Sequence, residues 1–108
     1  MECVFCKIAK RELPAKFVYE DEYVMVFPDI NPIKPIHLLV VPKIHIADFL
    51  DLDNDKLLGK MRVAIQKMVK EQKLTDRGYR LMLHGGGAQL IDHLHMHIVG
   101  PMGKAVKL

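Results

Sequence analysis

The segment 93–99, HLHMHIV, alternates histidine with apolar residues over its first six positions. A strict period of two is typical of a β-strand, because successive side chains point to opposite faces of a sheet. The pattern therefore predicts a last strand over His93–Val99, with three imidazoles on one face and apolar side chains on the other. Three neighbouring imidazoles would repel one another if all were charged, so a purely structural, solvent-facing role is disfavoured.

The rest of the chain predicts one long helix among short strands. The helix begins at Asp51, Asp53 or Asn54 and runs for about 18 residues, because apolar residues then recur at helical spacing. Three prolines make residues 28–35 a loop. The other expected elements are a short helix over 4–10 and strands over 16–20, 22–27, 37–41 and 79–84. This order predicts an α+β fold with an antiparallel five-stranded sheet, one long helix and a short N-terminal helix.

Composition narrows the class of protein. The 108 residues suit a single domain over 1–108. No apolar run approaches the roughly 18–20 residues of a membrane span, and the N-terminus lacks a signal-peptide core. A net charge of +3, no Trp and few aromatics argue against a nucleic-acid partner. Two cysteines are too few for a disulfide scaffold. We therefore expect a cytoplasmic protein with no membrane partner.

Two kinds of chemistry use histidines spaced in this way. Neutral imidazoles at His93, His95 and His97 could together hold a catalytic metal ion. Alternatively, one imidazole could attack phosphorus while its neighbours fix its tautomer and protonate the leaving group. The strand alone does not decide between the two.

The order of motifs along the chain resembles the histidine triad (HIT) family, in its purine nucleoside phosphoramidase branch. The triad signature of that family is His, apolar, His, apolar, His, apolar, apolar, and residues 93–99 match it at every position. The other matching segments are FCKI at 5–8, Phe27 with DINP at 29–32, His37 at the start of a buried strand, VPKIHI at 41–46 and GYR at 78–80.

This resemblance implies a homodimer in which two protomers pair their sheets into one of about ten strands. It also implies a nucleotide hydrolase or transferase, of the nucleoside phosphoramidase or the dinucleoside polyphosphate hydrolase type. Such an enzyme would cleave a phosphoramidate or phosphoanhydride bond at the α-phosphate of a purine nucleotide, an AMP or GMP conjugate, through a nucleotidyl-histidine intermediate. A different function, that of a nucleotide-binding regulatory module with weak or no catalysis, stays open.

The resemblance also implies roles for single residues. His95 would be the nucleophile, His97 would contact the phosphate or leaving group, and His37 would order the histidines. Asp29 would accept hydrogen bonds from the ribose, although a turn role is the alternative, and Gln89 would face the phosphate. The expected base pocket consists of Phe5, Ile8, Leu13, Phe27 and Ile30. All of these except Ile30 could otherwise be ordinary core residues.

A second site is indicated by Cys3 and Cys6, whose spacing is that of half a zinc site. Taken alone, the pair could equally be a redox pair or two buried thiols. The resemblance implies that His45 and His93 complete a Cys₂His₂ site for a structural Zn²⁺. His93 could otherwise only hydrogen-bond its neighbours.

Two residues depart from the family pattern. His84 stands where the family usually has Asn, and Leu90 stands where it has Ser or Thr, next to a shortened loop over 85–88. Leu90 cannot donate a hydrogen bond, and a lost contact to a charged group is worth about 1.5–3 kcal/mol. His84 could supply a compensating donor to the nucleotide, or it could be a solvent-facing strand end. Activity is therefore expected to be reduced or redirected.

Overall fold

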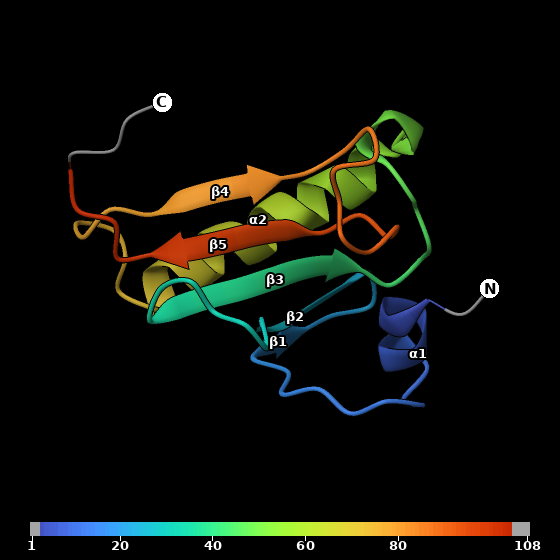
Figure 1. Ribbon diagram of the computed structural model, residues 1–108, viewed down its shortest axis with the longest axis horizontal. Helices are drawn as coiled ribbons and strands as arrows, with labels where there is room; N and C mark the ends of the chain where they lie inside the picture. Colours follow the sequence, from blue (N-terminus) through green and yellow to red (C-terminus); the bar gives the residue numbers. More distant parts are fainter. Residues whose placement is uncertain (1–2, 105–108) are drawn as a thin grey trace.

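The computed structural model of the chain, which describes residues 3–104, contains an antiparallel sheet of five strands with the long helix lying across one face (Figure 1). The strand order is β1-β2-β3-β5-β4, so α2 connects β3 to the far edge of the sheet. The helices are α1 (Val4–Ala9) and α2 (Asp55–Glu71), with a 3₁₀ turn, η1, at Phe49–Asp51. The strands are β1 (Tyr19–Glu20), β2 (Val24–Pro28), β3 (Ile36–Pro42), β4 (Arg80–Leu83) and β5 (Met96–Gly100).

This arrangement confirms the predicted α+β fold and the order of its elements. Residues 1–2 and 105–108 lie outside the described part, so the expected domain over 1–108 is described only for 3–104. Within that range, neither helix combines the length and the apolar character that crossing a membrane requires.

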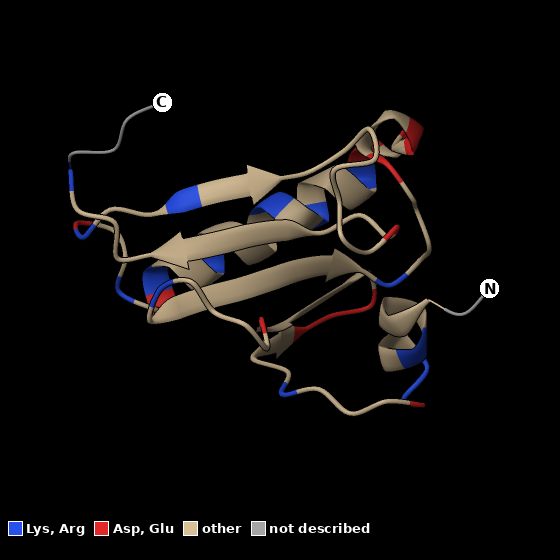
Figure 2. Cartoon of the chain, in the orientation of Figure 1, with Lys and Arg blue, Asp and Glu red and all other residues tan. Residues whose placement is uncertain are grey.

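The central strand β3 is buried on both faces of the sheet. Leu38 and Val40 pack with the apolar side of α2, whereas Leu39 and Val41 pack with Phe5 and other residues of the opposite cluster. In Figure 2, β3 and β5 carry no Lys, Arg, Asp or Glu, while charged residues lie on α2, at the start of β4 and in the loops. Two apolar clusters therefore hold the sheet, and the strand register places His37 and His97 on the same face as Leu39, opposite α2.

The last strand is shorter than the sequence pattern predicts. It begins at Met96 rather than His93 and pairs with β3 only as far as Val40. Two local bonds explain the difference, because the amide of Leu94 donates to the carbonyl of Ile46 and the imidazole of His93 bonds the carbonyl of Pro42. The alternation nevertheless keeps His95 and His97 close, with ring centroids 4.9 Å apart.

The other elements differ only at their ends. Asn54 is the N-cap of α2, since its side chain accepts a hydrogen bond from the amide of Leu57 at 3.0 Å. The predicted strand over 16–20 shrinks to Tyr19–Glu20, and the strand over 79–84 ends at Leu83, which leaves His84 in the following loop. On α2, Ala64 is buried with the apolar face, whereas Leu58 is exposed.

Candidate active site

The strand register brings His37 and His97 together. His97 pairs with Leu39 and Val99 pairs with His37, so the two histidines are diagonal neighbours on one face of the sheet. Their rings meet through Nε2 of His37 and Nδ1 of His97, which are 2.9 Å apart. Sixty residues of sequence therefore separate two imidazoles that share one hydrogen bond.

The proton positions in this pair follow from its outer partner. The amide of Ile33 donates to Nδ1 of His37 at 3.1 Å, so that nitrogen carries a lone pair and the proton lies on Nε2. We therefore assign His37 as the donor to Nδ1 of His97, and the proton of neutral His97 to Nε2. His97 is neutral near pH 7, because burial, and to a lesser degree His95, His37 and His84, lowers its pKa from 6.5 to about 4.

His95 has the opposite ring orientation. Its Nδ1 lies 2.8 Å from the carbonyl oxygen of His93, which can only accept, so Nδ1 carries the proton. Nε2 is thereby left with its lone pair, on a ring that is 7% exposed and packs edge-on against Phe5. A neutral imidazole nitrogen held in this way is suited to nucleophilic attack.

A cavity of about 750 Å³ opens in front of these histidines, and His95 and His97 are part of its wall. Its volume lies within the roughly 300–1,000 Å³ of small-molecule sites. Most of its lining is apolar. The lining residues are Val4, Phe5, Ile8, Pro14, Ala15, Lys16, Phe27, Pro28, Asp29, Ile30, Asn31, Leu39, His84, Ala88, Leu90, Ile91, His95 and His97.

Asp29 contributes both to the cavity wall and to the histidine pair. One carboxylate oxygen accepts from the amide of Asn31 at 2.8 Å, which is the turn considered from the sequence. The other oxygen lies 3.4 Å from Nε2 of His37 and 4.0 Å from Nδ1 of His97. The turn thus orients a carboxylate that also lines the cavity.

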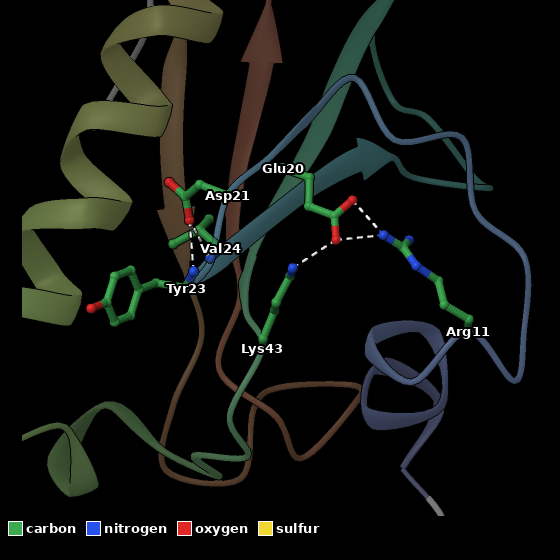
Figure 3. A network of polar contacts seen from close by, with 6 residues as sticks. All are labelled: Arg11, Glu20, Asp21, Tyr23, Val24 and Lys43. Carbon is green, nitrogen blue, oxygen red and sulfur yellow. Dashed lines mark hydrogen bonds and ion pairs between the residues drawn. The ribbon is translucent and has the colours of Figure 1, made fainter.

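The segment that carries Pro14, Ala15 and Lys16 along the cavity is tethered near its two ends. Figure 3 shows the carboxylate of Glu20 between the side chains of Arg11 and Lys43, with Lys43 at 2.6 Å. Arg11 also stacks over the ring of Phe17, 4.3 Å from its centroid. The hydrogen bond from Arg11, and then that from Lys43, lowers the pKa of Glu20, so the carboxylate stays charged and the segment keeps its place.

A separate group of possible metal ligands lies at the N-terminal end of α1. The side chains of Cys3, Cys6, His45 and His93 bring one ligand atom each to within 4.8 Å of the others. Nδ1 of His93 lies 3.3 Å from Sγ of Cys3 and 3.6 Å from Sγ of Cys6, and Nδ1 of His45 lies 3.3 Å from Sγ of Cys6. This group could hold a metal ion.

Both the geometry and the outer contacts of this group suit a metal ion. Sulfur and nitrogen ligands of one tetrahedral ion lie about 3.5 Å apart, given bonds of about 2.3 and 2.0–2.1 Å. Nε2 of His93 bonds the carbonyl of Pro42 at 2.8 Å, which leaves Nδ1 free to face the thiols. His93 therefore points away from the cavity, and the described residues give no indication of a single metal ion held by His93, His95 and His97 together.

Comparison with known proteins identifies the family. The family model described as "Scavenger mRNA decapping enzyme C-term binding" matches residues 2–107. The chain is 43% identical over 102 residues to Protein HitA of Neisseria gonorrhoeae, covering 91% of this chain and 94% of the relative. It is 37% identical over 110 residues to the purine nucleoside phosphoramidase of Escherichia coli K12, covering 94% and 91%.

Solved structures agree with the sequence comparisons. A HIT family hydrolase from Clostridium thermocellum superposes with a TM-score of 0.89 at 40% identity, covering 98% of this chain and 97% of that one. A histidine triad protein from Clostridium difficile gives 0.88 at 39% identity, covering 100% and 96%. The chain belongs to the histidine triad family.

Most of the residues that the HIT resemblance assigned to a nucleotide lie in the cavity wall, but two lie elsewhere. Leu13 is 37% exposed and does not occur among the lining residues of the described chain; Pro14 and Ala15 take its place. Gln89 is also absent from that lining. Its Oε1 accepts from the amide of Gly87 at 3.0 Å and its Nε2 donates to the carbonyl of Ala47 at 3.0 Å.

In the glycine loop over residues 85–88, the backbone amides of residues 86–88 are paired within the protein. Gly86 and Gly87 have φ of 65° and 93°, which only glycine adopts readily. Their amides donate to Asp48 and Gln89, and the amide of Ala88 donates to the carbonyl of Gly85. These donors are already paired in the loop, which argues against a phosphate cradle here.

Several cavity residues were not singled out from the sequence. Val4 precedes Ile8 by four residues, the spacing of one helix face, so this neighbour was recognisable. Asn31 lies in the DINP segment beside Asp29 and Ile30, whereas Lys16 carried no comparable signal, since only the folded loop brings it to the cavity. His84 and Leu90, the two departures from the HIT pattern, both line it.

Proposed function

We propose that this protein is a nucleotidyl hydrolase or transferase that cleaves a phosphoramidate or phosphoanhydride bond at the α-phosphate of a nucleoside monophosphate conjugate. The observation that carries the proposal is the orientation of His95. Its Nδ1 proton is engaged by the carbonyl of His93, so the lone pair of Nε2 is available at the wall of a cavity of nucleotide-compatible size.

The relatives support a hydrolase of this kind. One relative is named a purine nucleoside phosphoramidase, and a structural neighbour is titled a HIT family hydrolase. The HIT relatives thus favour a purine nucleotide as the ligand of this chain. The exact leaving group is not specified by these names.

In the proposed reaction, Nε2 of His95 forms a bond to phosphorus while the bond to the leaving group breaks. Neutral imidazole needs no prior deprotonation, and the resulting imidazolium keeps its Nδ1 proton on the carbonyl of His93. Water then attacks phosphorus, and the bond to Nε2 breaks with its electron pair returning to His95. The nucleotide is released and the starting tautomer is restored.

The pair of His37 and His97 would hold the reacting phosphate. Because Nδ1 of His97 accepts from His37, its Nε2 proton is available as a donor on a ring that lines the cavity. A donor that needs no rearrangement stabilises charge developing on the phosphate oxygens. His37 would act as a positioning residue, since it fixes the tautomer of His97.

The apolar end of the cavity would hold the base. Phe5 and Phe27 pack edge-to-face with centroids 5.7 Å apart, and Ile8 lies in the same cluster. Ile30 is 92% exposed and could cover a bound ring. The Asp29 carboxylate, an acceptor with two oxygens, would bind the ribose hydroxyls.

The test is to replace His95 with alanine and to measure both turnover and nucleotide binding. We expect hydrolysis of an adenosine 5′-phosphoramidate to fall by at least about 10⁴-fold, as for other removed nucleophiles. AMP binding, followed by calorimetry, should stay within about tenfold of the wild type. Wild-type turnover in this variant would show that His95 is not the nucleophile.

Leu90 favours a second candidate function, a nucleotide-binding regulatory module without useful catalysis. Leu90 lines the cavity, is 96% exposed and offers no hydrogen bond to a phosphate. The substitution Leu90→Ser separates the two candidates. A competent enzyme should change by less than about threefold, whereas a dormant site should gain tenfold or more.

We propose that the ion held by Cys3, Cys6, His45 and His93 is Zn²⁺, because two thiolates and two imidazoles in tetrahedral reach are its usual structural ligand set. With four protein ligands, the ion would have no open position for substrate. Its role would be to fasten the start of α1 to the loop after β3 and to the segment that precedes His95.

We also propose a homodimer formed through β4. β4 pairs with β5 on one side, and its other edge has no partner strand among residues 3–104. A second cavity, of about 630 Å³, is lined in part by α2 and β4, with apolar residues such as Leu58 and Leu81 and polar ones such as Arg62 and Gln66. Leu58 and Leu81 are 43% and 42% exposed there. Light scattering should give twice the chain mass, and Leu81→Lys should give the monomer; a monomeric wild type would contradict the dimer.

A further inference from the structure

His84 is a fourth imidazole at the cavity that the proposed reaction does not yet use. It follows β4 directly, is exposed, and lines the cavity together with His95 and His97. Its ring stands edge-on to that of His97, with centroids 5.3 Å apart and an interplanar angle of 84°. Apart from this ring contact, the two nitrogens of His84 form no hydrogen bond to residues 3–104.

Cleavage of a bond between phosphorus and nitrogen requires a proton for the departing amine. The buried pair of His37 and His97 has no proton to release. Neutral His97 could give up its Nε2 proton only by becoming an anion or by taking the proton of His37, and His37 in turn accepts from the backbone amide of Ile33, which does not ionise. This chain of donors can hold a phosphate by hydrogen bonds, but it cannot supply a net proton.

The exposed imidazole of His84, unlike the buried pair of His37 and His97, can obtain a proton from water. Its two nitrogens are open to water, with which an imidazole can exchange protons. His84 is also near enough for its charge to act on the site, since it is among the groups that lower the pKa of His97. The charged and titratable groups around it are His97 on β5, Asp48 beside the Gly85–Gly86 turn, and Asp29, Lys16 and His95 in the cavity wall.

We propose that His84 is a further catalytic residue, which as the imidazolium protonates the leaving nitrogen when His95 displaces it. The inference rests on the proposed function. In the first step the bond from Nε2 of His95 to phosphorus forms, the phosphorus–nitrogen bond breaks, and the departing nitrogen takes its proton from His84. In the second step His84, now neutral, accepts a proton from the water that attacks phosphorus, and the bond to His95 breaks.

This assignment gives the departure from the family pattern a chemical meaning. The sequence has imidazole where the HIT pattern has an amide, and an amide can donate a hydrogen bond but cannot transfer a proton at neutral pH. The same residue adjoins a loop whose amides are already paired. We therefore infer a preference for substrates whose leaving group is a basic amine, which departs only when protonated.

The experiment compares His84→Asn with the wild type on two substrates that differ in the leaving group alone. One is an adenosine 5′-phosphoramidate of an alkyl amine, and the other is adenosine 5′-(4-nitrophenyl phosphate), whose phenolate departs without a proton. We expect the variant to lose about 10²-fold in kcat/KM on the phosphoramidate, in the range of general acid catalysis. On the ester it should stay within about threefold, which also shows that the variant is folded.

The pH profile gives an independent readout. Wild-type kcat/KM on the phosphoramidate should fall as the pH rises and the imidazolium is lost, and this fall should be absent in His84→Asn. His84→Gln serves as a second variant if His84→Asn does not fold. Equal losses on both substrates, or an unchanged pH profile, would overturn the assignment.

The failure of this inference is distinguishable from failure of the proposed function. His95→Ala should lose both substrates, since the nucleophile serves both. If it does so while His84→Asn shows no dependence on the leaving group, only the role of His84 is wrong. If His95→Ala keeps both activities, the proposed function itself is wrong.

Discussion

His93 and His95 are two residues apart and are both buried, yet the structure prepares them for different chemistry. Both rings pack edge-on against Phe5, with centroids at 5.6 and 5.2 Å. His93 bonds the carbonyl of Pro42 through Nε2 and presents Nδ1 to two thiols, whereas His95 bonds the carbonyl of His93 through Nδ1 and keeps Nε2 for the cavity. Which carbonyl each ring meets decides which nitrogen is free.

This contrast separates His93 from His95 and His97, although the alternating sequence predicts all three on one face of a strand. The three histidines therefore belong to two regions. We call them the metal region, Cys3, Cys6, His45 and His93, and the reaction region, His37, His95 and His97. The backbone carbonyl of His93 connects them, because it orients His95. Under the proposed function, a metal ion bound there would support the reaction region and would take no part in the chemistry.

The largest effects are expected when either His93 or His95 is replaced. His93→Asn should reduce bound metal from one ion per chain to less than about 0.1, measured by plasma mass spectrometry, and lower Tm by about 10 °C or more. His95→Asn should keep the metal and lose turnover. Loss of metal in His95→Asn, or its retention in His93→Asn, would contradict the division into two regions.

A smaller effect is expected from acid on the reaction region. The unfolded chain binds a proton at His97 near pH 6.5, but the folded chain does so only near pH 4, because burial disfavours the imidazolium. Unfolding therefore takes up a proton between these values, and stability falls as the pH drops from 6.5 to 4, by about 3 kcal/mol in all.

Urea unfolding of the metal-free protein at pH 7 and pH 4 measures this loss. The metal is removed beforehand, since acid also releases metal ions from histidine and thiolate ligands. His97→Asn should show a shallower fall with pH than the wild type. An equal fall in both proteins would mean that His97 is not the group that resists protonation.

The smallest effect is expected at the ring that touches both regions. Phe5→Leu should lower the free energy of unfolding by about 1–2 kcal/mol and, by loosening both imidazoles, reduce metal affinity and kcat together by a few-fold. Phe17→Leu is the matched control, because among residues 3–104 the ring of Phe17 packs on that of Phe27 and forms no ring pair with His93 or His95. Phe17→Leu should lower stability without changing metal affinity; a similar loss of metal affinity in both variants would mean that Phe5 acts only through packing.

Much of the fold could be predicted from periodicity and the positions of proline. The run over 37–41 indicated a strand buried on both faces, and the two apolar clusters that flank β3 confirm it. The start of the last strand could not be predicted. Whether Leu94 pairs in the sheet or with the carbonyl of Ile46 depends on a loop whose course the local sequence does not determine.

The site was predictable in its residue types and less so in its proton positions. The rings of His37 and His95 both lie next to that of His97, with centroids 5.2 and 4.9 Å from it. The tautomers, in contrast, depend on the carbonyl of His93 and the amide of Ile33, which are backbone groups without a sequence signature. Gln89 was misplaced for a similar reason, since its amide is taken up by Gly87 and Ala47.

The central claim is that His95 becomes covalently bound to the nucleotide, and a rapid-quench experiment tests it most directly. The protein is mixed with excess adenosine 5′-phosphoramidate, quenched with base within milliseconds to preserve a phosphorus–nitrogen bond, digested and mapped by mass spectrometry. The account predicts an adenylyl group on the peptide that contains His95, absent in His95→Ala and present in His93→Asn. Turnover at the wild-type rate with no adenylylated peptide, or with the group on another residue, would contradict it.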